Sequence, residues 1–212
     1  KGKERDALKA QDLGGGIVAH LNGAGVVKAT VLVDPVAEAP LAPAPAAARI
    51  AYGARLRAYR FDKYRTKEKE EQKPTVTELT IAVAGAKAAE DAFQPLERVA
   101  EAVYFTRDLV SEPANVIYPA TLADAARTLG EIGVEVEILG VPEMRRLGMG
   151  ALLGVGQGSA HEPRLVVMQW KGAANRSEPP LAFVGKGVTF DTGGISIKPA
   201  DGMEEMKWDM GG

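Results

Sequence analysis

Residues 181–212 read LAFVGKGVTFDTGGISIKPADGMEEMKWDMGG. The apolar run Leu181–Val184 predicts a strand, and it leads directly into a Gly-Lys-Gly loop at 185–187. Ligands of open α/β sheets bind at the carboxyl ends of the strands. Four charged side chains are therefore expected to converge on one pocket at this end of the strand. They are Lys186, Asp191, Lys198 and Asp209.

Strand and helix patterns alternate in the residues that precede this segment. Val134–Leu139 alternates apolar and acidic residues, and Leu165–Trp170 is mainly apolar, so both predict strands. Thr121 is the expected N-cap of a helix ending at Leu129, and Pro142–Leu147 predicts a short helix. This alternation predicts an α/β domain with a mixed, largely parallel sheet.

A smaller α/β pattern occupies the N-terminal part. Val26–Val33 and Leu79–Val83 predict strands, and Ala46–Tyr59 predicts a helix. Residues 4–12 predict a short helix that stops at Gly14-Gly15-Gly16. The charged run KEKEEQK at 67–73 predicts a solvated loop.

Apolar residues of Ala86–Leu109 recur at helical spacing, with Pro95 near the expected start and Pro113 beyond the end. A long helix between two strand-bearing segments favours a connector between domains. We therefore expect residues 1–85 to form an N-terminal α/β domain, 86–112 a connecting helix and 113–212 the first part of a second α/β domain.

Composition excludes several classes of site. The 212 residues include 26 Lys+Arg and 28 Asp+Glu, a net charge of −2, which argues against a nucleic-acid binder. The absence of Cys excludes disulfides and thiolate chemistry, and two His cannot form a three-histidine zinc site. Any metal would need mainly oxygen ligands. No membrane span or signal peptide is visible in the sequence, so no membrane partner is expected.

The four charged residues near the C-terminus suit metal chemistry. Two carboxylates can hold a divalent ion through oxygen. A lysine amine ligates only when neutral, and a nearby dication disfavours its ammonium form. A second lysine that keeps its proton can polarise a carbonyl and stabilise an oxyanion. The alternative interpretation is a set of ordinary surface ion pairs on a Gly-rich turn.

The stretch Gly148–Gly158, GMGALLGVGQG, matches neither the dinucleotide fingerprint nor the phosphate-binding loop. It favours a flexible turn, with nucleotide binding as the alternative. His161 follows it, and a structural or exposed histidine is favoured over a catalytic one, as it is for His20.

Residues 184–199, VGKGVTFDTGGISIKP, and 206–212, MKWDMGG, closely resemble the signature of the M17 leucyl aminopeptidases, cytosolic di-metal exopeptidases. Residues 56–64, LRAYRFDKY, and 107–115, RDLVSEPAN, are similar to two further segments of that family. The resemblance covers most of the chain. It implies a smaller N-terminal domain joined by a long helix to the start of a zinc-peptidase-like catalytic domain.

The resemblance also implies residue roles. Lys186 matches a lysine metal ligand, and Asp191 matches the carboxylate shared by two metals. Asp209 matches the carboxylate that binds the lysine-bound metal and the substrate amine. Lys198 matches the catalytic lysine at the scissile carbonyl. Met206 matches a residue that lines the pocket for the first side chain of the substrate.

By this resemblance we expect a cytoplasmic, hexameric aminopeptidase that removes a neutral or hydrophobic first residue such as Leu from peptides. Two Zn²⁺ or Mn²⁺ ions would activate water, with bicarbonate as base. The family's N-T-D-A-E-G-R motif, which supplies two more acidic ligands and the bicarbonate arginine, does not occur in the sequence. The chain is therefore expected to be an internal fragment, inactive alone. The alternative is a non-catalytic or DNA-binding architectural role of the same scaffold.

Overall fold

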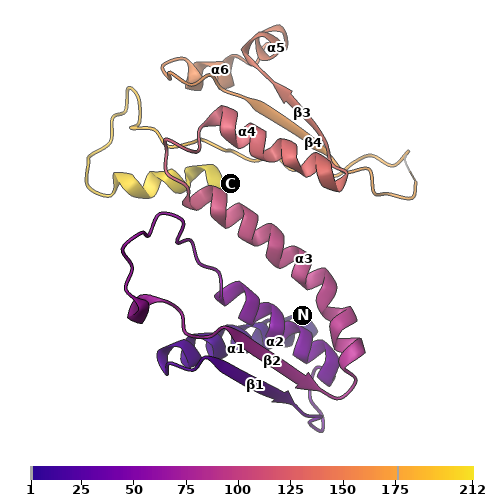
Figure 1. Cartoon of the computed structure of the whole chain (residues 1–212). Helices are drawn as coiled ribbons and strands as arrows, with labels where there is room; N and C mark the ends of the chain where they lie inside the picture. Colours follow the sequence, from indigo (N-terminus) through magenta and orange to yellow (C-terminus); the bar gives the residue numbers. More distant parts are fainter. Residues whose placement is uncertain (1, 176) are drawn as a thin grey trace. The chain divides into compact units, whose positions relative to one another are not determined.

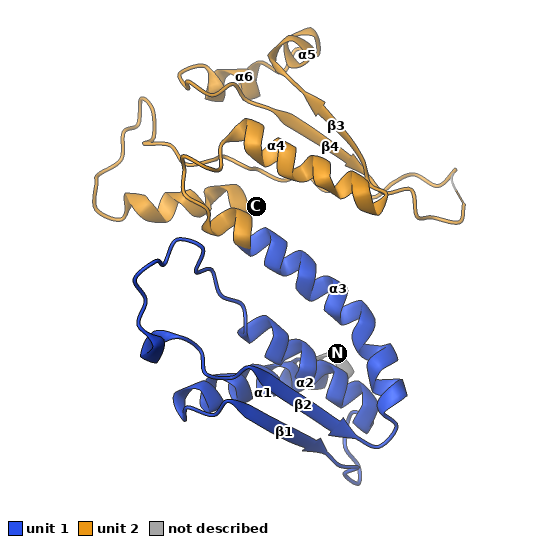
Figure 2. Ribbon diagram, viewed as in Figure 1, with its two compact units in different colours: residues 1–107 blue, residues 108–212 orange. Residues whose placement is uncertain are grey.

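A computed structural model describes residues 2–175 and 177–212, which form two compact units (Figure 1). Figure 2 colours unit 1, residues 1–107, and unit 2, residues 108–212. Each unit combines helices with a two-stranded sheet, so the predicted α/β fold class is confirmed. The finer division at residues 85 and 112 stays a prediction.

Unit 1 is built on a strand–helix–strand arrangement. Strands β1 and β2 are parallel and in register, from Lys28 opposite Glu78 to Val33 opposite Val83. Helix α2 supplies the crossover that parallel neighbours require. The elements in chain order are α1 (Gly2–Gly23), β1 (Lys28–Val33), α2 (Pro43–Arg57), η1 (Glu70–Gln72), β2 (Glu78–Val83) and α3 (Ala86–Ser111).

The strands and the two later helices of this unit confirm the sequence predictions to within a few residues. The prediction of a helix stopping at the glycines was wrong, because α1 runs through them to Gly23. A Cβ added at Gly14 would lie 1.9 Å from the carbonyl oxygen of Ile50, and one at Gly53 would lie 1.8 Å from that of Gln11. Glycine thus lets the backbones of α1 and α2 touch, and this packing overrides its weak helix propensity.

The C-terminal end of α2 is capped by side chains of α3. The Tyr104 hydroxyl donates to the carbonyl of Arg55, and the Arg107 guanidinium donates to that of Leu56 at 3.0 Å. The rings of Tyr59 and Tyr104 meet edge to face, with centroids 5.1 Å apart. Burial raises the pKa of Tyr104. The Leu56 carbonyl lies in the last turn, where helix carbonyls lack a partner within the helix, whereas the Arg55 carbonyl also accepts the N–H of Ala58 at 3.2 Å.

The charged run at 67–73 is only partly a solvated loop. The Glu68 side chain is 8% exposed, because it forms ion pairs with Arg60 and Arg65. A hydrogen bond from Arg60 is the main reason why the pKa of Glu68 lies below its usual value. Pro95 also departs from expectation, since it lies in the interior of α3 rather than near its start.

Unit 2 packs helices against an antiparallel strand pair, with Glu135 opposite Gln169 and Leu139 opposite Leu165. Its elements are α4 (Pro119–Arg127), η2 (Thr128–Ile132), β3 (Glu135–Leu139), α5 (Val141–Arg146), α6 (Gly150–Gly156), β4 (Leu165–Gln169) and η3 (Met203–Gly211). Its buried apolar residues are Ile117, Ala123, Met144 and Met210.

Three local predictions in unit 2 were wrong, and two of them concern helices. Thr121 is not the N-cap of α4: it lies inside the first turn, where its hydroxyl accepts the N–H of Tyr118 at 3.0 Å. The helix begins earlier because Pro119 has a backbone geometry suited to a first turn. The Gly-rich stretch is not a turn either, because residues Gly150–Gly156 form α6.

The predicted strand Leu181–Val184 is absent as a strand. Leu181, Phe183 and Val184 are 89%, 93% and 98% exposed. A strand needs a neighbour for its backbone N–H and C=O groups, and no strand among the described residues pairs with this segment.

Candidate functional site

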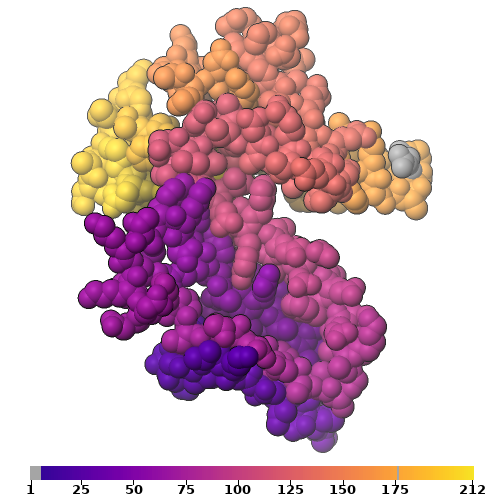
Figure 3. Space-filling model, viewed as in Figure 1, coloured from indigo at the N-terminus to yellow at the C-terminus, as the bar shows by residue number. Residues whose placement is uncertain are grey.

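The C-terminal residues of unit 2, yellow in Figure 3, lie at the surface of their unit. Here Lys186 approaches Asp209, 23 residues later in the chain: its Nζ donates to the Asp209 backbone carbonyl at 3.1 Å. A Cβ at Gly185 would lie 2.9 Å from the carbonyl oxygen of Gly212. The Gly-Lys-Gly loop therefore runs close to the end of η3, and the side chain between the glycines reaches the same place.

A hydrogen bond and a buried side chain hold η3 in position. Lys207 Nζ donates to the backbone carbonyl of Ser111 at 3.2 Å, and Met210 is buried with 9% of its surface exposed. Asp209 lies between these two anchored residues and is itself exposed. Met206 is half-buried. This arrangement leaves the Asp209 carboxylate open to solvent on a fixed backbone.

Residues 191–198 form a hydrogen-bonded turn. The Asp191 carboxylate accepts the N–H of Gly193 at 2.6 Å, and the Thr192 carbonyl accepts the N–H of Lys198 at 2.9 Å. Gly193 has φ 96°, in the left-handed region, and a Cβ there would lie 2.3 Å from the Ser196 carbonyl oxygen. Only glycine fits this position without a backbone shift.

The Lys198 side chain folds back onto the same turn. Its Nζ donates to the carbonyl of Ser196 at 2.9 Å and to the hydroxyl of Ser196 at 3.0 Å. Ser196 was not among the residues predicted from the sequence, because its position two residues before Lys198 does not show which way the lysine side chain folds.

The structure thus brings Lys186 to the Asp209 backbone, and Asp191 and Lys198 into one turn. Among the described residues, no hydrogen bond or ion pair links Asp191 to Lys186 or Asp209, and no cluster of three His, Cys, Asp or Glu side chains could hold a metal. That Lys186 and Asp191 share a metal stays a prediction. Two exposed carboxylates and an amine nevertheless fit a divalent cation in the kind of donor they offer.

His161 makes contacts of a structural kind. Its ring stacks on that of Tyr118 with centroids 4.1 Å apart, and the backbone N–H of His161 donates to the hydroxyl of Ser159 at 3.1 Å. These contacts agree with the structural interpretation of this histidine.

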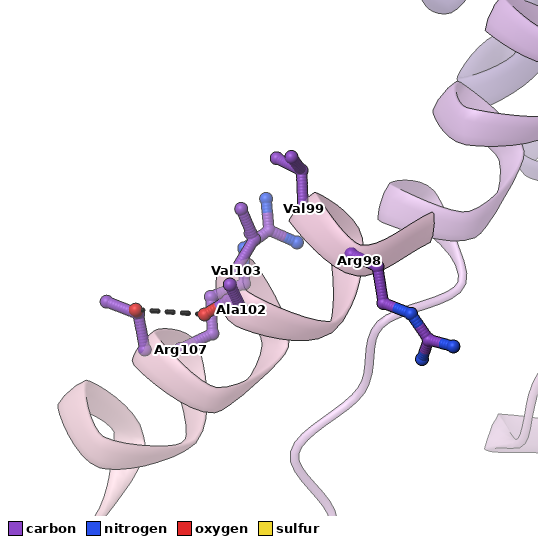
Figure 4. Close-up of a pocket in the computed structure, with 6 residues that line it drawn as sticks. Arg98, Val99, Ala102, Val103 and Arg107 are labelled. Atoms are coloured by element: carbon purple, nitrogen blue, oxygen red, sulfur yellow. Dashed lines mark hydrogen bonds between the residues drawn. The ribbon is translucent and has the colours of Figure 1, made fainter. Parts of the chain in front are cut away.

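A hollow of about 450 Å³ lies on α3 in unit 1 (Figure 4). It is lined by Arg98, Val99, Ala102, Val103, Thr106 and Arg107. All of them belong to one helix, and none is a predicted site residue, so the hollow gives no support for a substrate pocket.

Within residues 2–175 and 177–212, no helix has the length and apolar character of a membrane span.

Comparison with known proteins matches both units. Residues 104–212 match the cytosol aminopeptidase family, catalytic domain, and residues 1–68 match its N-terminal domain. A "Probable cytosol aminopeptidase" of Caulobacter vibrioides is 63% identical over 171 residues, which cover 81% of this chain and 35% of the relative. One of Bradyrhizobium sp. is 51% identical over 99% of this chain and 41% of the relative. The chain thus spans about two fifths or less of these relatives' length.

Two solved structures are similar to the whole fold. A mutant of tomato leucine aminopeptidase has a TM-score of 0.77 and 27% identity, covering 96% of this chain and 39% of that one. The bottromycin maturation enzyme BotP in complex with Mn has a TM-score of 0.73 and 31% identity, covering 96% and 42%. Since the catalytic-domain match alone spans more than half of the chain, the protein belongs to the cytosol aminopeptidase family.

Proposed function

We propose that the protein is a metal-dependent aminopeptidase that removes a neutral or hydrophobic first residue, such as Leu, from peptides. The observation that carries the proposal is the 3.1 Å contact between Lys186 and the backbone of Asp209. It joins two expected site residues within the segment that matches the family's catalytic domain. The names of the relatives support the same activity.

Lys186, Asp191 and Asp209 are the residues proposed to hold two divalent ions, Zn²⁺ or Mn²⁺. The manganese complex of the similar enzyme BotP supports metal dependence. When bound, such ions supply a water nucleophile at neutral pH and polarise the scissile carbonyl. Bicarbonate is the proposed auxiliary base.

Substrate selection is assigned to Asp209 and Met206. The exposed Asp209 carboxylate can pair with the free α-ammonium of a peptide, which only the N-terminal residue carries. This pairing would make the enzyme an exopeptidase. The half-buried Met206 offers a flexible apolar thioether to the first side chain, which suits a neutral or hydrophobic residue.

Lys198 is assigned the role of stabilising the negative charge that develops on the carbonyl oxygen of the substrate during attack. Its ammonium is held by Ser196 and lies in the same turn as Asp191. A fixed cation of this kind stabilises an oxyanion without reorganising as the charge forms. We further propose a cytoplasmic location and a hexameric assembly, both on the family resemblance.

Replacement of Lys198 tests this assignment. In the full-length protein, we expect Lys198→Ala to lower kcat for leucine p-nitroanilide by about 10²–10³, the typical cost of losing one oxyanion donor. Bound metal, measured by elemental analysis, should stay at the wild-type level because Lys198 is not proposed as a ligand. Unchanged turnover, or loss of metal from the variant, would contradict the role.

A further inference from the structure

We infer that Ser196 is a positioning residue for Lys198, an inference that rests on the proposed aminopeptidase function. The ammonium of Lys198 donates twice to this one residue: to its carbonyl oxygen at 2.9 Å and to its hydroxyl oxygen at 3.0 Å. Both atoms lie two residues away in the sequence. The pair therefore forms a local clamp on the end of a long, flexible side chain.

The number of donors fits a substrate-binding role. A lysine ammonium has three N–H groups and no acceptor. Among the described residues, Ser196 alone accepts hydrogen bonds from Lys198 Nζ, and it accepts two. One N–H is left for the substrate carbonyl oxygen, and the two fixed bonds limit where it can point. Fixing it before the substrate arrives reduces the entropy that must be lost at the reacting centre.

The two contacts differ in what they demand of residue 196. A carbonyl oxygen is present whatever the side chain, so that bond depends on the turn alone. The hydroxyl bond requires Ser or Thr. Replacing Ser196 by Ala removes one of the two contacts and leaves the other, whereas Thr keeps both.

The turn itself does not need the Ser196 hydroxyl. It is closed by the Lys198 N–H, which donates to the Thr192 carbonyl at 2.9 Å, and by the Gly193 N–H, which donates to Asp191 at 2.6 Å. Gly193 leaves room for the Ser196 carbonyl and the Lys198 side chain, since a Cβ there would be 2.3 Å from the Ser196 carbonyl oxygen and 3.1 Å from Lys198 Cγ. Ser196→Ala is therefore expected to keep the fold of the turn.

The experiment compares kcat and KM for leucine p-nitroanilide in the full-length protein. Ser196→Ala should lower kcat by about tenfold, the lower end of what a hydrogen bond to a charged group contributes, with KM near the wild-type value. Ser196→Thr should restore most of the lost kcat. The matched control is Ser177→Ala, which removes an exposed serine hydroxyl that donates to Asn175 at 2.7 Å. It should leave both constants unchanged.

A second background shows whether the hydroxyl acts through the lysine. In Lys198→Ala protein, adding Ser196→Ala should cause no further loss of kcat. An equal loss of kcat in both backgrounds would show that the hydroxyl does not act through Lys198 and would overturn the inference. Loss of bound metal, or of folded structure by circular dichroism, in Ser196→Ala would make its role structural and would overturn the inference as well.

The two proposals fail in different ways. Normal kcat in Ser196→Ala beside an impaired Lys198→Ala overturns the positioning role and leaves the proposed function standing. Normal kcat in Lys198→Ala overturns the catalytic assignment of the lysine, and with it the reason for a clamp.

Discussion

Glu68 lies between two arginines in the segment that joins α2 to β2. Its carboxylate accepts hydrogen bonds from Arg60 and from Arg65, the latter at 3.2 Å. The Arg60 bond is the main cause of a pKa below the usual 4.5. An acid with a lowered pKa in the folded state stabilises the fold above its unfolded pKa. That stabilisation is lost as the pH falls through the folded pKa.

We therefore predict that Glu68→Gln flattens the acid limb of the stability curve. The wild type should be the more stable protein near neutrality, and the difference should shrink as the pH falls below 4.5, where the carboxyl takes up its proton. The measurement is urea unfolding of both proteins at a series of pH values. Glu71→Gln, which removes the same charge from a neighbouring exposed residue, is the control. Parallel curves for wild type and Glu68→Gln would contradict the prediction.

At the scale of elements, the contact between α1 and α2 depends on a lack of side chains. Gly14 and Gly53 each face a backbone carbonyl of the other helix, at distances where a Cβ cannot fit. A methyl group at either position would force the two helices apart. Because backbone atoms cannot move aside as a side-chain end can, the whole interface would have to shift.

We predict that Gly14→Ala lowers the free energy of unfolding by about 1–3 kcal/mol, the usual cost of overpacking. Gly16→Ala is a matched control two residues along the same helix, where an added Cβ meets nothing within 4 Å. It should be neutral or stabilising by up to about 1 kcal/mol, because alanine favours a helix more than glycine does. Chemical denaturation of the two variants beside the wild type decides the matter, and equal effects would argue against the close contact.

These elements also show how far local sequence patterns reach. Val26–Val33 and Leu79–Val83 were predictable because apolar, β-branched runs describe a strand wherever it pairs. Gly14 was misleading, because its effect depends on close packing against Ile50 in another helix, which no local pattern reveals. Leu181–Val184 has the same apolar character as the other strands but lacks a partner among the described residues.

The candidate site also has features that the sequence predicted and features that it could not predict. Motif resemblance predicted Lys186 and Asp209 as site residues, and Gly185 lets the loop that carries Lys186 run close to Gly212, near Asp209. Ser196 could not be ranked above other serines, since its value lies in the direction in which the Lys198 side chain folds back. The position of Asp191 relative to Lys186 depends on how residues 187–190 run between them, which no local pattern specifies.

At the scale of the whole molecule, we predict that a polypeptide of residues 1–212 alone does not hydrolyse leucine amides at any Zn²⁺ or Mn²⁺ concentration. Its expected ligand set has two carboxylates and one amine, and the described residues contain no cluster of three acidic or imidazole groups. The amine must lose a proton to bind, which a weakly held ion drives poorly. Calorimetric titration with Mn²⁺ should accordingly show weak binding. Measurable hydrolysis by this polypeptide would contradict the prediction.

Most backbone N–H groups of residues 181–202 lack an acceptor, and this affects how fast they exchange hydrogen for deuterium. In the described part of that stretch, only the N–H groups of Gly193 and Lys198 have acceptors. The other amides should exchange with D₂O at nearly the rate of an unstructured peptide, because no opening step has to precede their exchange. Mass spectrometry with residue-level fragmentation, applied to the 1–212 polypeptide, should find these two slow sites alone within a fast segment. Slow exchange at these two sites would show that the turn that carries Lys198 stays ordered while the residues around it do not.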